Sequence, residues 1–351
     1  MLALISVVFF SCDKDDSEPP TVPSVTTAPL TNITSSSATT GGTIVDDGGA
    51  AITQSGIVLS KTNANPTLAD SVIAGTATTG SFTTDITGLE FNNTYYVRAF
   101  ATNSVGTGYG SALALNTVDD TSKVRFTYNG EEVVYGIIIS PTTGKKWLDR
   151  NLGAKRAAMA FDDYEAYGDL FQWGRPADGH ELMNWTASTT GTAINGMTAV
   201  LATSDNPDHN NFIDANSSAA YDWRDDNNNN RWGTAPTGAC PAGWHVPTEN
   251  EWKSEVSAAL YSGGTATSGG MIDRSTAYSM LKLTSSGFRR GYGTEVGQFT
   301  RTGTEGFYWS STVRTAIPDY YDSFYASFSS DFIGVDVFER SLAMSIRCVK
   351  D

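Results

Sequence analysis

The chain has 351 residues, which is long enough for two domains that each bury a core. Its 38 acidic residues outnumber the 23 basic ones and give a formal net charge of -15. This balance argues against nucleic-acid binding, because a nucleic-acid-binding protein needs basic groups that displace counterions from phosphates. It argues equally against electrostatic docking on anionic lipid.

The chain begins with an apolar run, residues 1–10, which is followed by Ser11 and Cys12. The run is shorter than the roughly 20 residues that span a bilayer, but its length suits a secretory signal. An apolar run that ends in a small residue and a cysteine resembles the processing site of bacterial lipoproteins. The resemblance implies that residues 1–11 are a signal peptide and that Cys12 carries lipid. A simple signal peptide or a truncated hydrophobic tail is the alternative.

Residues 12–24 begin with Cys-Asp-Lys-Asp-Asp and then become rich in proline and in polar residues. Such a composition buries too little apolar surface to fold, so we expect a flexible tether. The acidic start resembles the export signal of Bacteroidota-type surface lipoproteins. That resemblance implies a lipid-anchored protein on the outer face of the outer membrane.

Residues 25–118 contain short alternating runs separated by polar turns, which predicts an antiparallel β-sandwich. The stretch from Leu89 to Gly106 resembles the end of a fibronectin type III domain, in which a leucine six residues before a tyrosine marks the tyrosine corner. The resemblance implies that the Tyr95 hydroxyl bonds to backbone upstream. We interpret this domain as a spacer, and a binding role is the alternative.

A polar stretch, residues 119–123, predicts a linker, and the composition changes after it. All eight tryptophans lie between Trp147 and Trp309, and apolar runs are short among many Gly, Asn and Asp residues. One helix is well marked, because Thr248 and Glu251 form the pattern of a capping box and Trp252 follows. Residues 124–351 are therefore predicted to be an α+β domain with long loops.

Several segments of this domain are similar, in order, to the Fibrobacter succinogenes major paralogous domain. They are residues 146–152, 167–174, 240–248, 286–289, 306–312 and 345–350. The resemblance implies a C-type lectin-like fold, with a twisted antiparallel sheet, one or two flanking helices and long loops. It implies a fold more firmly than a function.

The sequence contains three cysteines, Cys12, Cys240 and Cys348. If Cys12 carries lipid, the other two form one pair, and an exported protein meets an oxidising compartment. We therefore predict a disulfide between Cys240 and Cys348 that joins the start of the helix to the last strand. Two free buried thiols are the alternative.

Metal and nucleophile motifs are weak in this sequence. The histidines His180, His209 and His245 lack the close spacing of a zinc site, and we interpret His245 as a buried structural residue. No Gly-x-Ser-x-Gly or phosphate-binding loop is present. The Asx-rich segment 222–233 offers oxygens that suit calcium, with these candidate ligands: Asp222, Asp225, Asp226 and Asn228. The same side chains also simply cap turns, and the spacing does not match an EF-hand loop.

Aromatic side chains in polar loops suggest a surface that stacks on sugar rings. The candidates are Trp185, Trp223, Trp232, Tyr320 and Tyr321. For four other tryptophans, core packing is the better interpretation: Trp147, Trp173, Trp244 and Trp309.

These observations favour a non-catalytic cell-surface module for binding or adhesion, with a glycan or a protein as its ligand. We expect no catalytic residue and, apart from calcium, no cofactor. One alternative is a polysaccharide-acting enzyme that uses clustered carboxylates: Asp162, Asp163, Glu165 and Asp169, or Asp319, Asp322 and Asp331. Another is a purely structural component of the surface.

Overall fold

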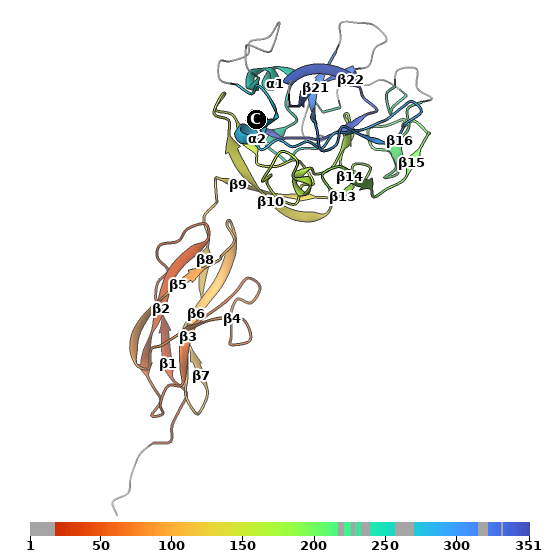
Figure 1. Ribbon diagram of the computed structural model, residues 1–351. Helices are drawn as coiled ribbons and strands as arrows, with labels where there is room; N and C mark the ends of the chain where they lie inside the picture. Colours follow the sequence, from red (N-terminus) through yellow and green to blue (C-terminus); the bar gives the residue numbers. More distant parts are fainter. Residues whose placement is uncertain are drawn as a thin grey trace, which may run out of the picture. The chain divides into compact units, whose positions relative to one another are not determined.

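The computed structural model describes residues 18–216, 221–225, 229, 231–232, 239–256, 270–314, 322–330 and 333–351 (Figure 1). The chain divides into two compact units, Met1–Thr121 and Ser122–Asp351. The division falls within the predicted linker. No helix among the described residues is both long and apolar enough to cross a membrane.

The first unit consists of strands alone in the part that the structure describes. Their bounds are β1 Ser24–Thr27, β2 Ser37–Asp46, β3 Gln54–Ser60, β4 Ser71–Gly75, β5 Gly80–Thr87, β6 Thr94–Thr102, β7 Thr107–Tyr109 and β8 Leu113–Asn116.

These strands form two antiparallel sheets, β1-β2-β5 and β4-β3-β6-β7, with β8 paired to β6. Side chains from both sheets, among them Ile86 on β5 and Val97 on β6, share one buried core. The predicted β-sandwich is therefore confirmed. The Tyr95 hydroxyl accepts a hydrogen bond from the backbone N–H of Glu90, 3.0 Å away, so the expected tyrosine corner is present.

The second unit combines many short strands with three short helices in its described part. The bounds of its elements are β9 Lys123–Tyr128, β10 Glu131–Ile139, β11 Lys146–Leu148, η1 Tyr164–Ala166, β12 Phe171–Gln172, β13 Met183–Ala187, β14 Thr190–Ala193, β15 Met197–Thr198, β16 Phe212–Ile213, β17 Trp244–His245, α1 Glu249–Glu255, α2 Arg274–Leu281, β18 Phe288–Arg289, β19 Phe299–Thr300, β20 Gly306–Val313, β21 Asp322–Phe328, β22 Ile333–Glu339, β23 Ala343–Met344 and β24 Val349–Lys350.

The largest sheet of this unit has five strands in the order β17-β24-β11-β10-β9. A four-stranded sheet, β12-β23-β18-β19, and a three-stranded one, β20-β21-β22, accompany it. The pairings within these sheets are antiparallel, as in the register of β9 with β10. The sequence pattern of residues 274–281 did not reveal α2, because its mixed polar composition gives no clear helical stripe.

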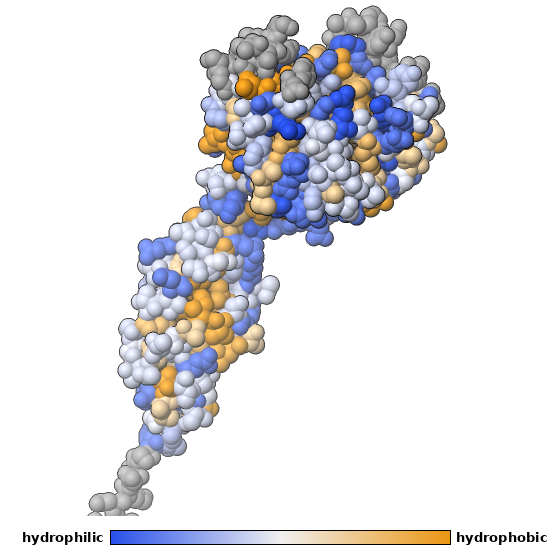
Figure 2. Space-filling view, viewed as in Figure 1, coloured by the Kyte–Doolittle hydropathy of each residue, from blue (hydrophilic) through white to orange (hydrophobic). Residues whose placement is uncertain are grey.

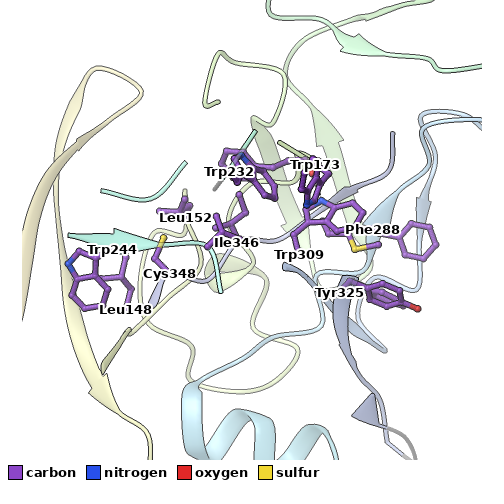
Figure 3. Packing of buried hydrophobic residues seen from close by; sticks show 14 of the residues in the cluster. Leu148, Leu152, Trp173, Trp232, Trp244, Phe288, Trp309, Tyr325, Ile346 and Cys348 are labelled. Atoms are coloured by element: carbon purple, nitrogen blue, oxygen red, sulfur yellow. The ribbon is translucent and has the colours of Figure 1, made fainter. Parts of the chain in front are cut away.

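Aromatic side chains fill the interior of the second unit, whereas hydrophilic residues cover much of the face shown in Figure 2. The four tryptophans expected in the core are all at most 5% exposed. Trp173 and Trp309 share one cluster with Trp244 (Figure 3), and Trp147 packs in another against Trp252. Burial of large aromatic side chains stabilises the domain, because each removes a large apolar area from water.

The predicted disulfide is present. The sulfur atoms of Cys240 and Cys348 are 2.11 Å apart and their Cα atoms 5.8 Å apart. Cys348 directly precedes β24 and Cys240 lies shortly before β17, its pairing partner. The bond therefore joins two adjacent strand segments rather than the start of a helix and a strand.

The capping box of α1 is confirmed. The Thr248 side chain accepts a hydrogen bond from the Glu251 N–H at 3.2 Å, and the Glu251 carboxylate accepts one from the Thr248 N–H at 2.8 Å. The helix ends at Glu255, whereas the four-residue spacing of Trp252, Val256 and Leu260 in the sequence predicts a longer helix. Val256 is already extended and forms a bridge with Met271, and Leu260 lies outside the described residues.

Candidate functional site

The tryptophans expected to stack on a ligand are buried instead. Trp185, Trp223 and Trp232 are 8%, 0% and 4% exposed. Each indole N–H donates a hydrogen bond to a backbone carbonyl oxygen. For example, the Trp223 Nε1 lies 2.6 Å from the carbonyl oxygen of Trp173. The expectation that they lie exposed in polar loops is wrong, and Tyr320 and Tyr321 lie outside the described residues.

The calcium interpretation is wrong for its first ligand. Both carboxylate oxygens of Asp222 accept hydrogen bonds from Arg231, at 2.8 and 2.9 Å, and the pair is fully buried. The Arg231 guanidinium also lies over the ring of Trp223. Asp225 is exposed, and two of the proposed ligands, Asp226 and Asn228, lie outside the described residues.

Of the seven acidic residues that the sequence groups into clusters, five are described by the structure, and three of these five are engaged by arginine. Asp163 and Glu165 both bind Arg156, which donates to Asp163 at 2.7 Å and to Glu165 at 2.8 Å. Asp322 pairs with Arg314. Asp162 is exposed, and Asp319 and Asp331 lie outside the described residues. Asp169 differs from the others and is described below.

One group of side chains has the composition of a metal site, with ligand atoms of Asp178, His180 and Glu181 within 4.8 Å of one another. Its hydrogen bonds favour a different role. The Gln172 N–H donates to His180 Nε2 at 3.0 Å, so the ring proton sits on Nδ1 and points at Asp178, 2.7 Å away. A metal on Nδ1 would leave the imidazole without any proton. The group is therefore a buried structural hydrogen-bond network.

The other two histidines also have structural partners. The Asn211 N–H donates to the ring of His209. His245 is only partly buried, unlike the expectation, and lies between the carboxylates of Glu251 and Asp351. The hydrogen bond to Glu251 raises the pKa of His245 above its usual value, against the effect of burial, and Asp351 adds to the increase.

A cleft of about 470 Å³ opens beside the β9–β10 hairpin of the second unit. We call it the hairpin cleft. It is lined by Tyr128, Asn129, Glu131, Val133, Val134, Tyr135, Arg150, Gly153, Ala154, Lys155, Asp169, Leu182 and Met183. Tyrosine, valine, leucine and methionine give it apolar walls, and both signs of charge are represented. This mixture is typical of small-molecule sites.

Asp169 is the most buried charged group of the cleft and is 5% exposed. Its Oδ2 accepts a hydrogen bond from the Tyr128 hydroxyl at 2.8 Å, and its Oδ1 accepts one from the Met183 N–H at 2.9 Å. Burial raises the pKa of Asp169 to about 7, although these two donors oppose the increase. Burial next to this carboxyl also raises the pKa of Tyr128 well above its ordinary value.

Basic groups form another part of the cleft lining. The Arg150 guanidinium lies 4.7 Å from the centre of the Tyr135 ring and binds the Asp149 carboxylate through two nitrogens, at 2.7 and 3.0 Å. The Tyr135 hydroxyl accepts the N–H of Gly153 at 3.0 Å, which leaves its own proton available for donation. Lys155 is exposed.

The backbone beside Asp169 requires glycine. Gly153 has a φ of +77°, and a Cβ built there would lie 2.0 Å from Asp169 Oδ2. Any larger residue would therefore push the carboxylate away from Tyr128.

Sequence reasoning named Asp169 only as one member of an acidic cluster, and it missed the hairpin that places Tyr128 above it. A signal was available. Asn129-Gly130 has positive φ at both positions, 49° and 83°, as expected for the tight turn that this dipeptide favours between antiparallel strands. The β9–β10 hairpin could therefore have been predicted from its sequence.

Comparisons with solved structures give weak likenesses. The sensor domain of the anti-sigma factor RsgI4 in Pseudobacteroides cellulosolvens is 17% identical, with a TM-score of 0.23, and the match covers 28% of this chain and 98% of that one. A human FNIII domain is also 17% identical, with a TM-score of 0.25 and coverage of 33% and 92%. A titin crystal structure is 21% identical, with a TM-score of 0.21 and coverage of 28% and 32%. These scores carry no argument about the fold, which comes from the strand pairing above.

The family of the chain follows from comparison with protein-family models. No curated protein matches the chain. The sequence pattern of the Fibrobacter succinogenes major domain matches residues 143–350, which is more than half of the chain. The match includes the disulfide and much of the lining of the hairpin cleft, from Arg150 to Met183. The chain therefore belongs to the Fibrobacter succinogenes major domain family.

Proposed function

We propose that this chain is a non-catalytic binding module of the bacterial cell surface and that it binds a glycan in the hairpin cleft. The observation that carries the proposal is the chemistry of the cleft. It combines a buried acceptor, Asp169, with a donor, Lys155, and with apolar walls.

A sugar matches this combination better than a purely apolar or purely ionic ligand. Each sugar hydroxyl both donates and accepts hydrogen bonds, so it can use acceptors and donors that lie close together. The C–H faces of the ring can pack on apolar side chains such as Val133 and Leu182. The volume of about 470 Å³ falls within the range of roughly 300–1,000 Å³ that is usual for ligand pockets.

The engagement of the acidic clusters supports a binding role rather than hydrolysis. A glycoside hydrolase needs two carboxyl groups, about 5–10 Å apart, on either side of the scissile bond. Asp163 and Glu165 instead lie on the same guanidinium, that of Arg156, at 2.7 and 2.8 Å.

In this proposal the second unit is a C-type lectin-like domain, and lipid on Cys12 anchors the chain to the outer membrane with the cleft exposed to the medium. The β-sandwich unit is a spacer. Antiparallel sheets, two short α-helices and long loops support the lectin-like assignment. The apolar run before Cys12 supports export, and the Cys240–Cys348 disulfide suits an oxidising compartment.

A glycan array probed with the full chain tests the binding role. We expect binding that falls at least about tenfold in Lys155→Glu, which reverses a charge at the cleft. Lys146→Glu, an equal charge reversal at an exposed position outside the cleft lining, is the matched control and should bind like the wild type. Binding to no glycan, or equal loss in both variants, would contradict the proposal.

The location is tested separately in cells. Protease treatment of intact cells should remove the wild-type chain from their surface. Cys12→Ser should release the chain from the membrane fraction, since it lacks the sulfur that carries lipid. A Cys12→Ser chain that stays in the membrane fraction would contradict lipid anchoring.

A further inference from the structure

Asp169 is a buried carboxyl group that lines the hairpin cleft and forms no ion pair with any described residue. We infer that Asp169 determines the specificity of the cleft: its ionised carboxylate accepts a hydrogen bond from a hydroxyl of a neutral sugar, so that binding strengthens as the pH rises through neutrality. This inference rests on the glycan-binding role proposed above and adds to it the group that selects the ligand and the condition that controls it.

The geometry leaves acceptor capacity on the carboxylate. An ionised carboxylate has about four lone-pair sites. The protein supplies two donors, the Tyr128 hydroxyl to Oδ2 and the Met183 N–H to Oδ1. Gly153, which has no Cβ, allows the backbone to pass close to Oδ2 without displacing it. The carboxylate is thus fixed in position and can accept a further donor from the cleft.

The charges around Asp169 do not neutralise it. Tyr128 and Tyr135 face it from β9 and β10, and burial keeps both phenols uncharged by raising their pKa. Glu181, in the loop between β12 and β13, acts electrostatically to raise the pKa of Asp169 further. Arg150 is occupied by the carboxylate of Asp149. Two more charged residues, Glu131 and Lys155, line the cleft from exposed positions.

The direction of the pH effect follows from the hydrogen bond. Burial places the pKa of Asp169 at about 7, so its charge changes near neutrality. A hydroxyl bonds more strongly to a carboxylate than to a neutral carboxylic acid. A ligand hydroxyl therefore favours the ionised form, and the apparent affinity must increase with pH until that form predominates.

The experiment is a neutral-oligosaccharide array probed with the full chain at about pH 5.5 and about pH 8.5. We expect the wild type to bind about tenfold more tightly at the higher pH. Asp169→Asn, which cannot ionise, should bind weakly and equally at both. Asp208→Asn, at an exposed position outside the cleft lining, should keep the wild-type profile.

Wild-type binding that does not change with pH, or a pH profile that Asp169→Asn retains, would overturn the inference while leaving the glycan-binding role intact. Failure to bind at either pH would overturn both. A second measurement uses the wild-type chain without any ligand, so it does not depend on whether Asp169→Asn folds. The carbon-13 signal of the Asp169 carboxyl in the free wild-type chain should titrate near pH 7, and a midpoint near the ordinary 3.8 would refute the inference.

Discussion

The Asp169 carboxyl also affects the stability of the second unit. Its folded-state pKa of about 7 exceeds the ordinary value of 3.8, so the folded state retains a proton over a pH range in which the unfolded state has lost it. Its contribution to stability is therefore complete below about pH 4 and is lost as the pH rises towards 7. The loss is up to about 4 kcal/mol, because each pKa unit corresponds to about 1.4 kcal/mol.

Asp169→Asn should remove this part of the pH dependence. Urea unfolding of the second unit at about pH 4.5 and about pH 8 would measure it. We expect the wild type to lose a few kcal/mol more than the variant between the two conditions. Parallel losses in both proteins would show that Asp169 titrates normally.

The pH dependence of His245 has the same direction as that of Asp169. The pKa of His245 is raised by the hydrogen bonds to Glu251 and Asp351, so its contribution is complete below the unfolded value of about 6.5 and is lost as the pH rises through the folded pKa. Since the ring is partly exposed, we expect His245→Gln to destabilise by less than about 1 kcal/mol at pH 6. At about pH 9 the variant and the wild type should unfold at the same urea concentration. A larger difference at pH 9 than at pH 6 would contradict this assignment.

At the scale of elements, the loop that contains Gly153 lines the hairpin cleft and packs against Asp169. Gly153→Ala places a methyl group against Asp169 Oδ2 and forces alanine into positive φ. Gly144→Ala is a matched control, because Gly144 has a similar φ of +73° and nothing within 4 Å of a Cβ. We expect Gly153→Ala to be about 1–3 kcal/mol less stable than the control by chemical denaturation. Equal losses would mean that only backbone strain matters at Gly153.

The elements that could be predicted from sequence are those that local rules specify. The capping box of α1 needs only Thr248 and Glu251, and the alternating run that contains Tyr95 defines β6. The disulfide was predicted from the number of cysteines together with the expectation that the chain is exported. The places of Trp223 and Trp232 could not be predicted in this way. The segment around them is polar in sequence, yet both indoles are buried, as is the ion pair between Arg231 and Asp222.

The candidate site was harder to predict from the sequence than these elements. Its floor and walls come from β9, β10, the loop around Gly153 and β13, and no short pattern shows that these segments meet. The acidic cluster at 162–169 was visible in the sequence. Asp169 differs from the arginine-bound Asp163 and Glu165 in being buried. Its burial depends on the β9–β10 hairpin, whose Tyr128 contacts it.

At the scale of the whole molecule, the two compact units should respond differently to loss of the disulfide. Cys240 and Cys348 both belong to the second unit and lie 108 residues apart. Replacing both by alanine should destabilise that unit by about 2–4 kcal/mol, because the unfolded chain regains the freedom that the cross-link removes. In calorimetry the transition of the β-sandwich unit should not move. A shift of both transitions, or of neither, would contradict this expectation.

The order of the five-stranded sheet constrains how the chain can mature. Its last strand in sequence, β24, lies between β17 and β11, so the sheet cannot be completed by adding strands at one edge as the chain emerges. As the polypeptide is made from its N-terminus, β9, β10 and β11 are present with an unfilled place beside them until residues 348–350 are added. The sulfur bridge can close only at that moment. A chain that stops before Cys348 would therefore leave the Cys240 thiol without its partner and β11 with an open strand edge.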